Sequence, residues 1–171
     1  MVMNLEAGGF SQLVPNTYDE CLDAASEKPG AQRLEKMVSG RYLGTLYALA
    51  LADIMNLKNA PPLTAIDLAK VISEKLAGDA LTPRAKRQAI ALAAAIAGRS
   101  AGLVAAAFAG VLRHRAADRM MPSRCIAVEG SLYEKFPGLS VTVARALTIF
   151  LQGSGITPPA VCLMRNGAIL G

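Results

Sequence analysis

The short signatures by which many enzymes can be identified are missing from this sequence. It contains no GxxxxGK[ST] phosphate loop, no GxGxxG, no HExxH and no CxxC. These absences argue against a self-contained P-loop enzyme, a Rossmann enzyme and a zinc protease. Tryptophan is also absent, and much of the 53% hydrophobic content is alanine. Such a composition favours closely packed helices over a β-sandwich, which would be richer in β-branched and aromatic residues.

Cysteine and histidine are scarce. Cys21, Cys125 and Cys162 are odd in number and far apart in the sequence, so we expect reduced thiols in a cytoplasmic protein. Cys125 and Cys162 lie in apolar runs and are predicted to be buried as small hydrophobic residues. His114 is the single histidine and is flanked by arginines. No metal site is therefore expected in the chain.

Charged residues make up only 18% of the chain, with a net charge of +5. The basic residues cluster around Arg113, Arg115, Arg119 and Arg124. No aromatic residues are interleaved with them, so no platform for stacking nucleic-acid bases is indicated. A solvated helix end, favoured by the helix dipole, explains the cluster. We therefore expect no nucleic-acid partner.

Residues 88–112 form one long apolar stretch, near the roughly 20 residues of a membrane span. Arg99 and Ser100 interrupt its middle, and alanine anchors a helix in lipid less well than leucine. At the start of the chain, Glu6 and the Gly8–Gly9 pair do not suit a signal peptide. We predict a buried helix and no membrane span.

The 171 residues suit one domain with a sizeable core. Apolar periodicity and capping signals predict helices over 32–57, 64–77, 82–119 and 137–151, after a short helix begun by Asn16 or Thr17. Strands are predicted over 124–128 and 160–164, a turn at 166–167, and the end of a further strand over 1–5. Two apolar strands separated by a helix indicate a βαβ unit on a parallel sheet. The fold class is therefore α/β and rich in helix.

Glycines lie within the helix predicted over residues 32–57. Gly40 and Gly44 are four residues apart and would share one helix face. Each costs roughly 1 kcal/mol relative to alanine in a helix. This pattern predicts a close approach of the backbone to another helix or to a ligand, and spacing alone favours helix packing. Glu35 lies in the first turn, where the helix dipole favours a carboxylate.

Three segments together resemble hexokinases and glucokinases. The run 29–44, PGAQRLEKMVSGRYLG, is similar to their proline-glycine, glutamate-lysine-methionine, serine-glycine and leucine-glycine run. Asn4-x-Glu6-x-Gly8-x-Phe10 resembles their asparagine-x-glutamate motif, and residues 128–137, VEGSLYEKFP, resemble their valine-aspartate-glycine-serine-x-tyrosine loop. The resemblance implies part of the large lobe of an actin-like, ribonuclease H-like ATPase fold. Residues 1–171 would then be a single, incomplete domain of it.

The resemblance also implies site residues. In this family two large-lobe glutamates accept hydrogen bonds from hexose hydroxyls, and the matching positions are Glu6 and Glu35. Charged acceptors form stronger hydrogen bonds than neutral ones. A site that pairs particular hydroxyls also rejects sugars that lack them. Glucose is the expected hexose.

The family's nucleotide contacts match Gly40 with Arg41, and Gly130 with Ser131. Because Gly130 follows a predicted strand, backbone N–H groups of this turn could face a phosphate, although an ordinary strand-end turn has the same sequence. Arg41 could pair with a phosphate or extend into solvent. The co-substrate implied is ATP with Mg²⁺.

The sequence departs from the family's pattern at several places. Ala7 stands where many members have tryptophan, and Glu129 replaces the usual aspartate. No Asp-x-Gly-Gly-Thr loop and no Asn-Asp pair occur. In the family these belong to the N-terminal small lobe, together with the catalytic aspartate. Phosphoryl transfer depends on positioning the hydroxyl and neutralising phosphate charge, so no catalytic residue is expected in this chain.

Three functions follow as hypotheses. The first is the large-lobe fragment of a cytoplasmic, glycolytic, ATP-dependent hexokinase that phosphorylates a hexose at its 6-hydroxyl, inactive without its missing N-terminal small lobe. The second is a non-catalytic sugar- or nucleotide-binding regulatory module of the same fold. The third is a helical packing or membrane-proximal domain with no small-molecule role.

Overall fold

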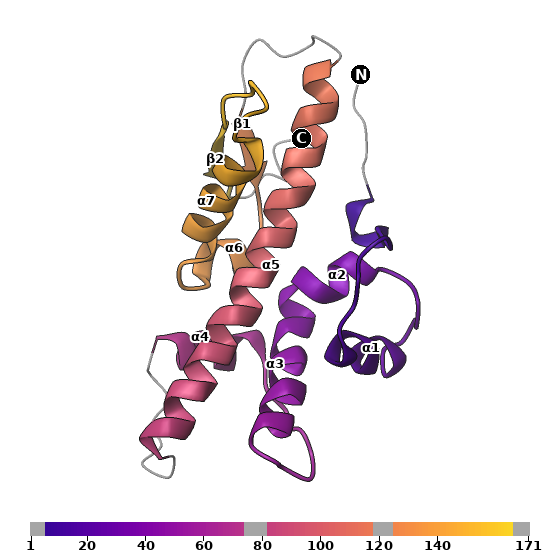
Figure 1. Ribbon diagram of the computed structural model, residues 1–171, viewed down its shortest axis with the longest axis vertical. Helices are drawn as coiled ribbons and strands as arrows, with labels where there is room; N and C mark the ends of the chain where they lie inside the picture. Colours follow the sequence, from indigo (N-terminus) through magenta and orange to yellow (C-terminus); the bar gives the residue numbers. More distant parts are fainter. Residues whose placement is uncertain (1–5, 74–81, 118–124, 166–171) are drawn as a thin grey trace. The chain divides into compact units, whose positions relative to one another are not determined.

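The computed structural model describes residues 6–73, 82–117 and 125–165. Their elements, in chain order, are η1 (Ala7–Gly9), α1 (Thr17–Ala24), α2 (Arg33–Val38), α3 (Gly40–Ile54), α4 (Ala65–Ile72), α5 (Pro83–Ala117), β1 (Cys125–Val128), α6 (Ser131–Lys135), α7 (Leu139–Leu151) and β2 (Ala160–Leu163). Figure 1 shows this order along the chain. The chain divides into two compact units, residues 1–100 and 101–171. The boundary lies within α5, between Gly98 and Gly102. Predictions for residues 1–5 and 166–167 lie outside the described residues.

Two helices of the first unit begin with capping boxes, as the sequence predicts. The Asn16 side chain accepts a hydrogen bond from the Asp19 N–H, and the Asp19 carboxylate accepts one from the Asn16 N–H. Thr64 and Asp67 form the same reciprocal pair at the start of α4. Each box satisfies two of the N–H groups that a helix start leaves without partners. The predicted starts of α1 and α4 are therefore confirmed.

The single helix predicted over 32–57 is wrong, because it is divided into α2 and α3. Ser39 lies between them in an extended conformation, with φ −77° and ψ 141°. Its side chain accepts a hydrogen bond from the Arg41 N–H at 3.3 Å, so it serves as the N-cap of α3. Serine competes for backbone hydrogen bonds inside helices, and the following Gly40 is a poor helix former. The apolar stripe continues across the break, so periodicity gave no sign of it.

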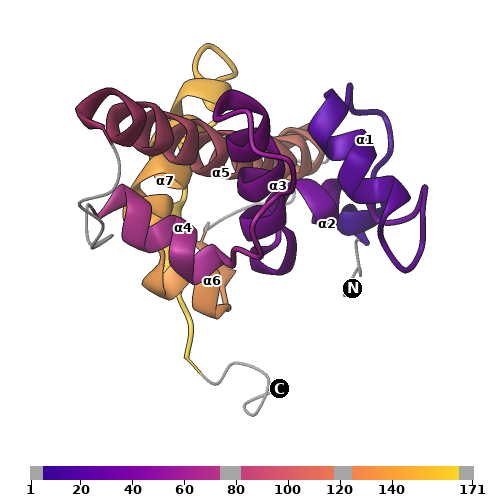
Figure 2. The same cartoon turned by 90° about the horizontal axis from the view of Figure 1, so that it is seen from below.

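The core of the first unit surrounds α3, which contacts α1, α2 and α4. The first part of α5 also packs here, with Ala89, Ala93 and Ala97 buried. The Tyr47 hydroxyl donates to the Ala89 carbonyl at 3.3 Å, and the Ser100 hydroxyl donates to the Val38 carbonyl at 3.1 Å. Figure 2 shows α1, α2 and α3 grouped together in this unit. These two hydrogen bonds connect α5 to α3 and to α2.

Gly44 is in close contact with the segment before α4. A Cβ atom built on Gly44 would lie 2.3 Å from the carbonyl carbon of Thr64 and 2.4 Å from the carbonyl oxygen of Leu63. Real Cβ atoms do not approach backbone so closely. The predicted close approach of the backbone at Gly44 is thus confirmed, but its partner is the segment before α4, so the prediction of helix packing is wrong.

The helix predicted over 82–119 is a single element, α5. Thr82 caps its start by accepting a hydrogen bond from the Ala85 N–H at 3.2 Å. Among the described residues, α5 is the one helix long and apolar enough to cross a membrane by length and composition. A core helix satisfies the same criterion but is mostly buried, whereas 33% of the apolar window of α5 is buried, so the prediction of a buried helix holds only in part. Its buried positions recur every four residues: Ala89, Ala93, Ala97, Ala101, Ala105 and Ala109.

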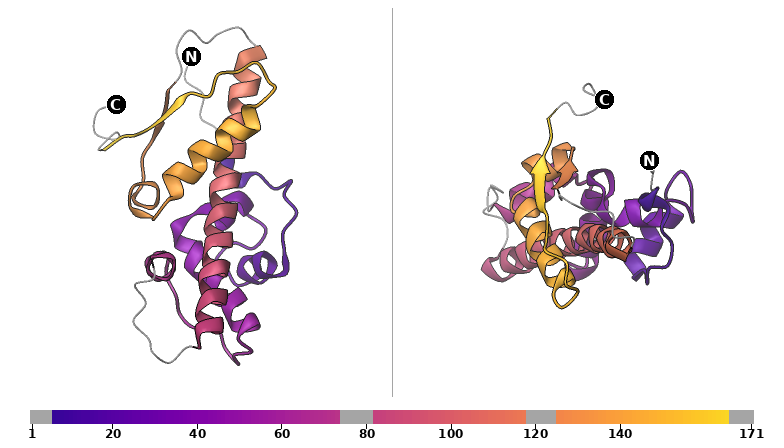
Figure 3. Two further views of the ribbon diagram at one scale, coloured as in Figure 1. Left: turned by 60° about the vertical axis from the view of Figure 1, so that its left-hand side comes forward. Right: turned by 90° about the horizontal axis from the view of Figure 1, so that it is seen from above.

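The second unit contains the predicted βαβ arrangement. Strands β1 and β2 are parallel, with Cys125 opposite Ala160 and Val128 opposite Leu163, and they lie side by side in Figure 3. The crossover contains α6 as well as α7, which begins at Leu139 rather than at Pro137, after Gly138 in the left-handed region. Helix α7 buries Leu139, Val143, Leu147 and Leu151. The Arg113 guanidinium of α5 donates to the Phe150 carbonyl of α7.

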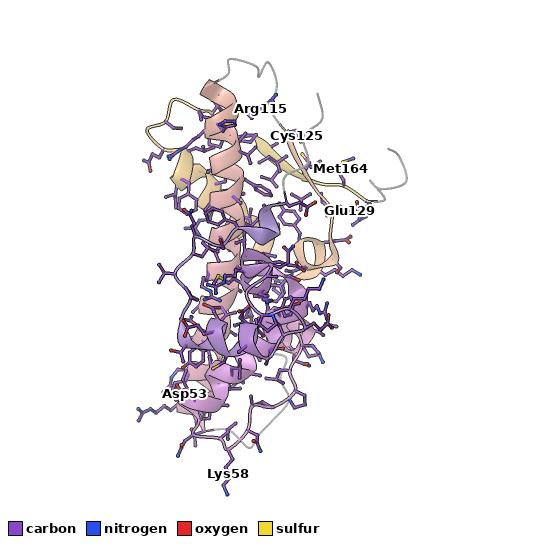
Figure 4. The ribbon with its side chains drawn as sticks, turned by 90° about the vertical axis from the view of Figure 1, so that its right-hand side faces the viewer. Asp53, Lys58, Arg115, Cys125, Glu129 and Met164 are labelled. Atoms are coloured by element: carbon purple, nitrogen blue, oxygen red, sulfur yellow. The ribbon has the colours of Figure 1, made fainter. Side chains whose placement is uncertain are left out.

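The prediction that Cys125 and Cys162 are buried is wrong. Both thiols are exposed, on the face of the sheet that Ala127 and Ala160 share. Figure 4 labels Cys125 in β1 and Glu129 just beyond the end of this strand. A hydrogen bond with Cys162 raises the pKa of the Cys125 thiol. Apolar runs are typical of strands covered on both faces, whereas the described sheet has two strands and one half-buried face.

Two ion pairs of the first unit differ greatly in burial. Arg99 of α5 donates to both carboxylate oxygens of Asp19 in α1, each at 2.7 Å, and the Asp19 side chain is 4% exposed. Arg41 pairs with Glu27 at 2.7 Å, but these side chains are 61% and 79% exposed. The first pair connects two helices through a buried carboxylate, and the second lies in water.

Replacing Gly44 tests the close approach of α3. We expect Gly44→Ala to lower the free energy of unfolding by about 2 kcal/mol or more, because the methyl group would overlap backbone that cannot rotate away. Gly98→Ala is the matched control, since nothing lies within 4 Å of its Cβ position. It should raise stability by about 0.5–1 kcal/mol through helix propensity. Urea denaturation followed by circular dichroism measures both; equal effects would contradict the packing described.

Removing the two arginines separately tests the difference in burial. Arg99→Met leaves the Asp19 carboxylate buried without its cation, and should cost about 2–4 kcal/mol of unfolding free energy. Arg41→Met removes an exposed pair and should change stability by about 0.5 kcal/mol or less. Guanidinium titrations of the two variants measure these changes. A loss below about 1 kcal/mol for Arg99→Met would show that the pair does not anchor α1.

Candidate active site

The structure brings the turn that follows Glu6 against the helix that carries Glu35. Glu6 is the N-cap residue of η1, and its carbonyl accepts a hydrogen bond from the Gly9 N–H at 3.0 Å. The turn packs on α2. A Cβ atom built on Gly8 would lie 3.3 Å from Glu35 Cβ and 3.7 Å from Glu35 Oε2. The two predicted hexose ligands therefore belong to neighbouring elements of one unit. Asn4, the first residue of the resembling motif, lies outside the described residues.

Gly8 leaves room for a third polar group, Gln32. The Cβ position of Gly8 is 2.7 Å from Gln32 Oε1, so a larger residue would displace this amide. Gln32 directly precedes α2 in a left-handed conformation, with φ 52°. Its amide supplies both donors and an acceptor beside Glu35. Sequence reasoning did not select Gln32, although it lies inside the run 29–44 that carries the resemblance.

The Glu35 carboxylate is half-buried in the first turn of α2. Its backbone carbonyl accepts a hydrogen bond from the Ser39 N–H at 2.8 Å. Its carboxylate oxygens form no hydrogen bond or salt bridge within residues 6–73, 82–117 and 125–165. The group is thus an anionic acceptor available to hydroxyl donors.

Lys36, the residue after Glu35, is buried and connects α2 to α1. The Lys36 ammonium forms a salt bridge with Asp23 and donates to the Lys28 carbonyl at 2.7 Å. The Asp23 carboxylate also accepts a hydrogen bond from the Gly30 N–H at 2.8 Å. The hydrogen bond from Lys36, and then that from Gly30, hold the pKa of the Asp23 carboxyl below its usual value. These contacts fix the loop that leads into α2.

A cavity of about 290 Å³ lies beside this salt bridge. It is lined by residues of α1, α2 and the loops next to them, including Glu20, Arg33 and Met37. Neither Glu6 nor Glu35 lines it. The cavity is therefore separate from the predicted hexose ligands.

The predicted nucleotide contacts fall in both units. Gly40 begins α3, and the Arg41 guanidinium donates to Glu27 and lies 5.4 Å from the centroid of the Tyr42 ring. Arg41 thus has a protein partner that neither sequence-based alternative included. In the second unit, Gly130 has φ 146°, a conformation that favours glycine, and Ser131 begins α6 with an exposed side chain. Each pair is described within its own unit.

Comparison with known proteins identifies the family. The family model described as hexokinase matches residues 1–171. Hexokinase-7 of Oryza sativa subsp. japonica is 30% identical over 100% of this chain and 43% of its own length. Hexokinase-2 of Arabidopsis thaliana is also 30% identical, over 100% of this chain and 40% of its own. The chain therefore spans less than half the length of these relatives.

Solved structures give the same result for the fold. A crystal structure of hexokinase matches with a TM-score of 0.82 and 22% identity, covering 96% of this chain and 41% of that one. Hexokinase from Schistosoma mansoni complexed with glucose matches with a TM-score of 0.68 and 22% identity, covering 88% and 38%. The fold is thus the expected helix-rich α/β part of an actin-like ATPase. From its family match and its fold, the chain belongs to the hexokinase family.

Proposed function

We propose that this chain is a single, incomplete large-lobe domain of an ATP-dependent hexokinase, which phosphorylates a hexose at its 6-hydroxyl. The observation that carries the proposal is the packing of the η1 turn on α2, which brings the chain around Glu6 next to Glu35. The family match over residues 1–171 supports the same reading, and one structural neighbour is complexed with glucose. A cytoplasmic, glycolytic role is part of the proposal.

Hexose recognition follows from the chemistry of the two carboxylates. Sugar hydroxyls donate hydrogen bonds to Glu6 and Glu35, and the Gln32 amide lies next to Gly8 with Glu35. A hydrogen bond to a charged group contributes about 1.5–3 kcal/mol. Acceptors at fixed positions also orient the ring, so that one hydroxyl is directed towards the phosphate donor. A sugar that lacks a paired hydroxyl leaves a carboxylate without its partner and is rejected.

The nucleotide would be ATP with Mg²⁺, and its proposed contacts are Gly40 and Arg41 in the first unit and Gly130 and Ser131 in the second. The ion enters with the phosphates, because Mg²⁺ is commonly bound by phosphate oxygens and few protein ligands. Backbone N–H groups at Gly130 and Ser131 suit an anionic oxygen. Arg41 must leave Glu27 to reach a phosphate. This exchange costs little, because an exposed pair such as this one contributes about 0–1 kcal/mol.

The catalytic aspartate and the phosphate-binding Asp-x-Gly-Gly-Thr loop are proposed to lie in a small lobe outside this sequence. Without them the hexose hydroxyl has no base and the phosphates lack part of their binding site. Phosphoryl transfer depends on such positioning and charge neutralisation, rather than on covalent chemistry by the protein. The 171-residue chain alone is therefore proposed to be inactive.

An activity assay tests whether the catalytic aspartate lies in the small lobe. With glucose and Mg-ATP, the 171-residue chain should give no measurable glucose 6-phosphate in a coupled assay. The longer polypeptide that also carries the small lobe should give turnover. Product formed by the chain alone would contradict the proposed location of the base. A longer polypeptide that binds glucose but phosphorylates no hexose would instead favour the non-catalytic regulatory module.

Substituting Glu35 tests the proposed sugar contact. In the longer polypeptide, Glu35→Gln keeps the size of the side chain but removes its charge, and should raise KM for glucose by about 10-fold to 100-fold. Glu20→Gln changes another glutamate of the same unit that is exposed on α1, and should leave KM within about twofold. Deoxyhexoses identify the hydroxyl that Glu35 binds. The increase in KM caused by Glu35→Gln should be smallest for the sugar that lacks this hydroxyl. Equal defects for every deoxyhexose would argue against direct contact.

A further inference from the structure

Helix α1 carries two carboxylates that hold two other helices. Asp19 and Asp23 are four residues apart, so they lie on one face of α1. Asp19 binds Arg99 of α5 through two hydrogen bonds, and Asp23 binds Lys36 of α2. The result is a continuous series of ion pairs from α5 through α1 to α2. Figure 2 shows α1 lying next to α2.

The Lys36–Asp23 pair joins two short helices through charges that are largely buried. The Lys36 side chain is 6% exposed and the Asp23 side chain 20% exposed. Removing charges from water is costly, and apolar residues of similar volume often stabilise a protein equally well or better. An ammonium with defined partners, however, fixes direction as well as distance. Here its partners are the Asp23 carboxylate and the Lys28 carbonyl.

Helix α2 needs such external support because it has only six residues. A helix of this length does not form alone in water. Leu34 and Met37 attach it to the core, and the Ser100 hydroxyl binds the Val38 carbonyl at its last residue. Apolar contacts are not directional. The Lys36 salt bridge therefore supplies a constraint on rotation of α2 about its axis.

Rotation of α2 moves Glu35 directly. A side-chain atom about 6 Å from a helix axis is displaced by about 1 Å when the helix turns by about 10°. A displacement of this size in a reacting or binding group can change rates by about 10²-fold. Glu35 Cβ lies 3.3 Å from the position that a Cβ atom of Gly8 would take in the η1 turn, so small rotations change the position of Glu35 relative to the chain around Glu6.

The same salt bridge fixes the direction of the Lys36 side chain. Lys36 is adjacent to Glu35 in the sequence, but its ammonium is held by Asp23 and the Lys28 carbonyl. Residues adjacent in a helix do not face each other, so Lys36 is directed to α1 while Glu35 lies beside the η1 turn. Asp23 stays ionised to low pH because its pKa is lowered by these hydrogen bonds.

We infer that Asp23 and Lys36, together with the Asp19–Arg99 pair, are positioning residues that set the orientation of α2 and thereby the place of Glu35 beside the η1 turn. This inference rests on the proposed role of Glu35 as a hexose ligand. It predicts that hexose affinity depends on two residues whose contacts are with each other and with backbone groups of the 28–30 turn.

A paired substitution separates orientation from stability. Asp23→Leu combined with Lys36→Met replaces the ion pair by apolar groups, so the thermal midpoint should stay within a few degrees of the parent. Amide hydrogen exchange of residues 33–38, measured in the 171-residue chain, should quicken by about tenfold, while α7 amides are unchanged. In the longer polypeptide, KM for glucose should rise by about tenfold with a smaller change in kcat. Lys70→Met, which removes an exposed pair on α4, should change none of these.

The outcomes are decisive in each direction. A folded double variant with unchanged α2 exchange, or with fast exchange but unchanged KM, overturns the inference. If the double variant does not fold, Asp23→Asn replaces it, and a smaller shift of exchange and KM in the same direction is required. Glu35→Gln is measured in parallel. If that variant alone leaves KM unchanged, the proposed sugar contact fails, and the exchange of residues 33–38 still decides whether the salt bridge orients α2.

Discussion

The first unit depends on the carboxylates of α1, which join parts of the chain that are distant in sequence. Asp19 and Arg99 are 80 residues apart, and Asp23 and Lys36 are 13 apart. Without these pairs α1 and α2 would be short helices held by few apolar residues. Leu22 is the one buried hydrophobic residue of α1. Ion pairs therefore help to attach α1 and α2 to the rest of the unit, whereas a longer helix would be attached mainly by its apolar face.

Local signals predicted much of the fold. Asn16 and Thr64 begin helices because their side chains bind nearby backbone N–H groups, an interaction encoded within four residues. The βαβ unit followed from two apolar strands around a helix. The break at Ser39 was missed because the apolar stripe continues through it. The break is caused by Ser39, which caps the start of α3 instead of continuing a helix. Apolar periodicity carries no signal for such a cap.

Exposure and long-range pairing were harder to predict. Cys125 and Cys162 were expected to be buried because their neighbours are apolar, yet sheet faces alternate and these thiols lie on the open one. The partner of Lys36 is in another helix, and the partner of Arg99 is much further away. No pattern in sequence pairs one acidic residue with a particular distant cation. For the same reason, Glu6 and Glu35 came from resemblance to a family, and the packing of the η1 turn beside Glu35 came from the structure.

Asp19 links the first turn of α1 to a helix that is distant in the sequence. The Asp19 Oδ2 atom accepts hydrogen bonds from both the Asn16 N–H and the Arg99 guanidinium. The start of the helix and its docking on α5 therefore share one atom. Fraying of the first turn and detachment of the helix become a single event, rather than two independent ones. Helix α1 should open as one cooperative unit with its long-range anchor, although isolated helix ends usually open on their own.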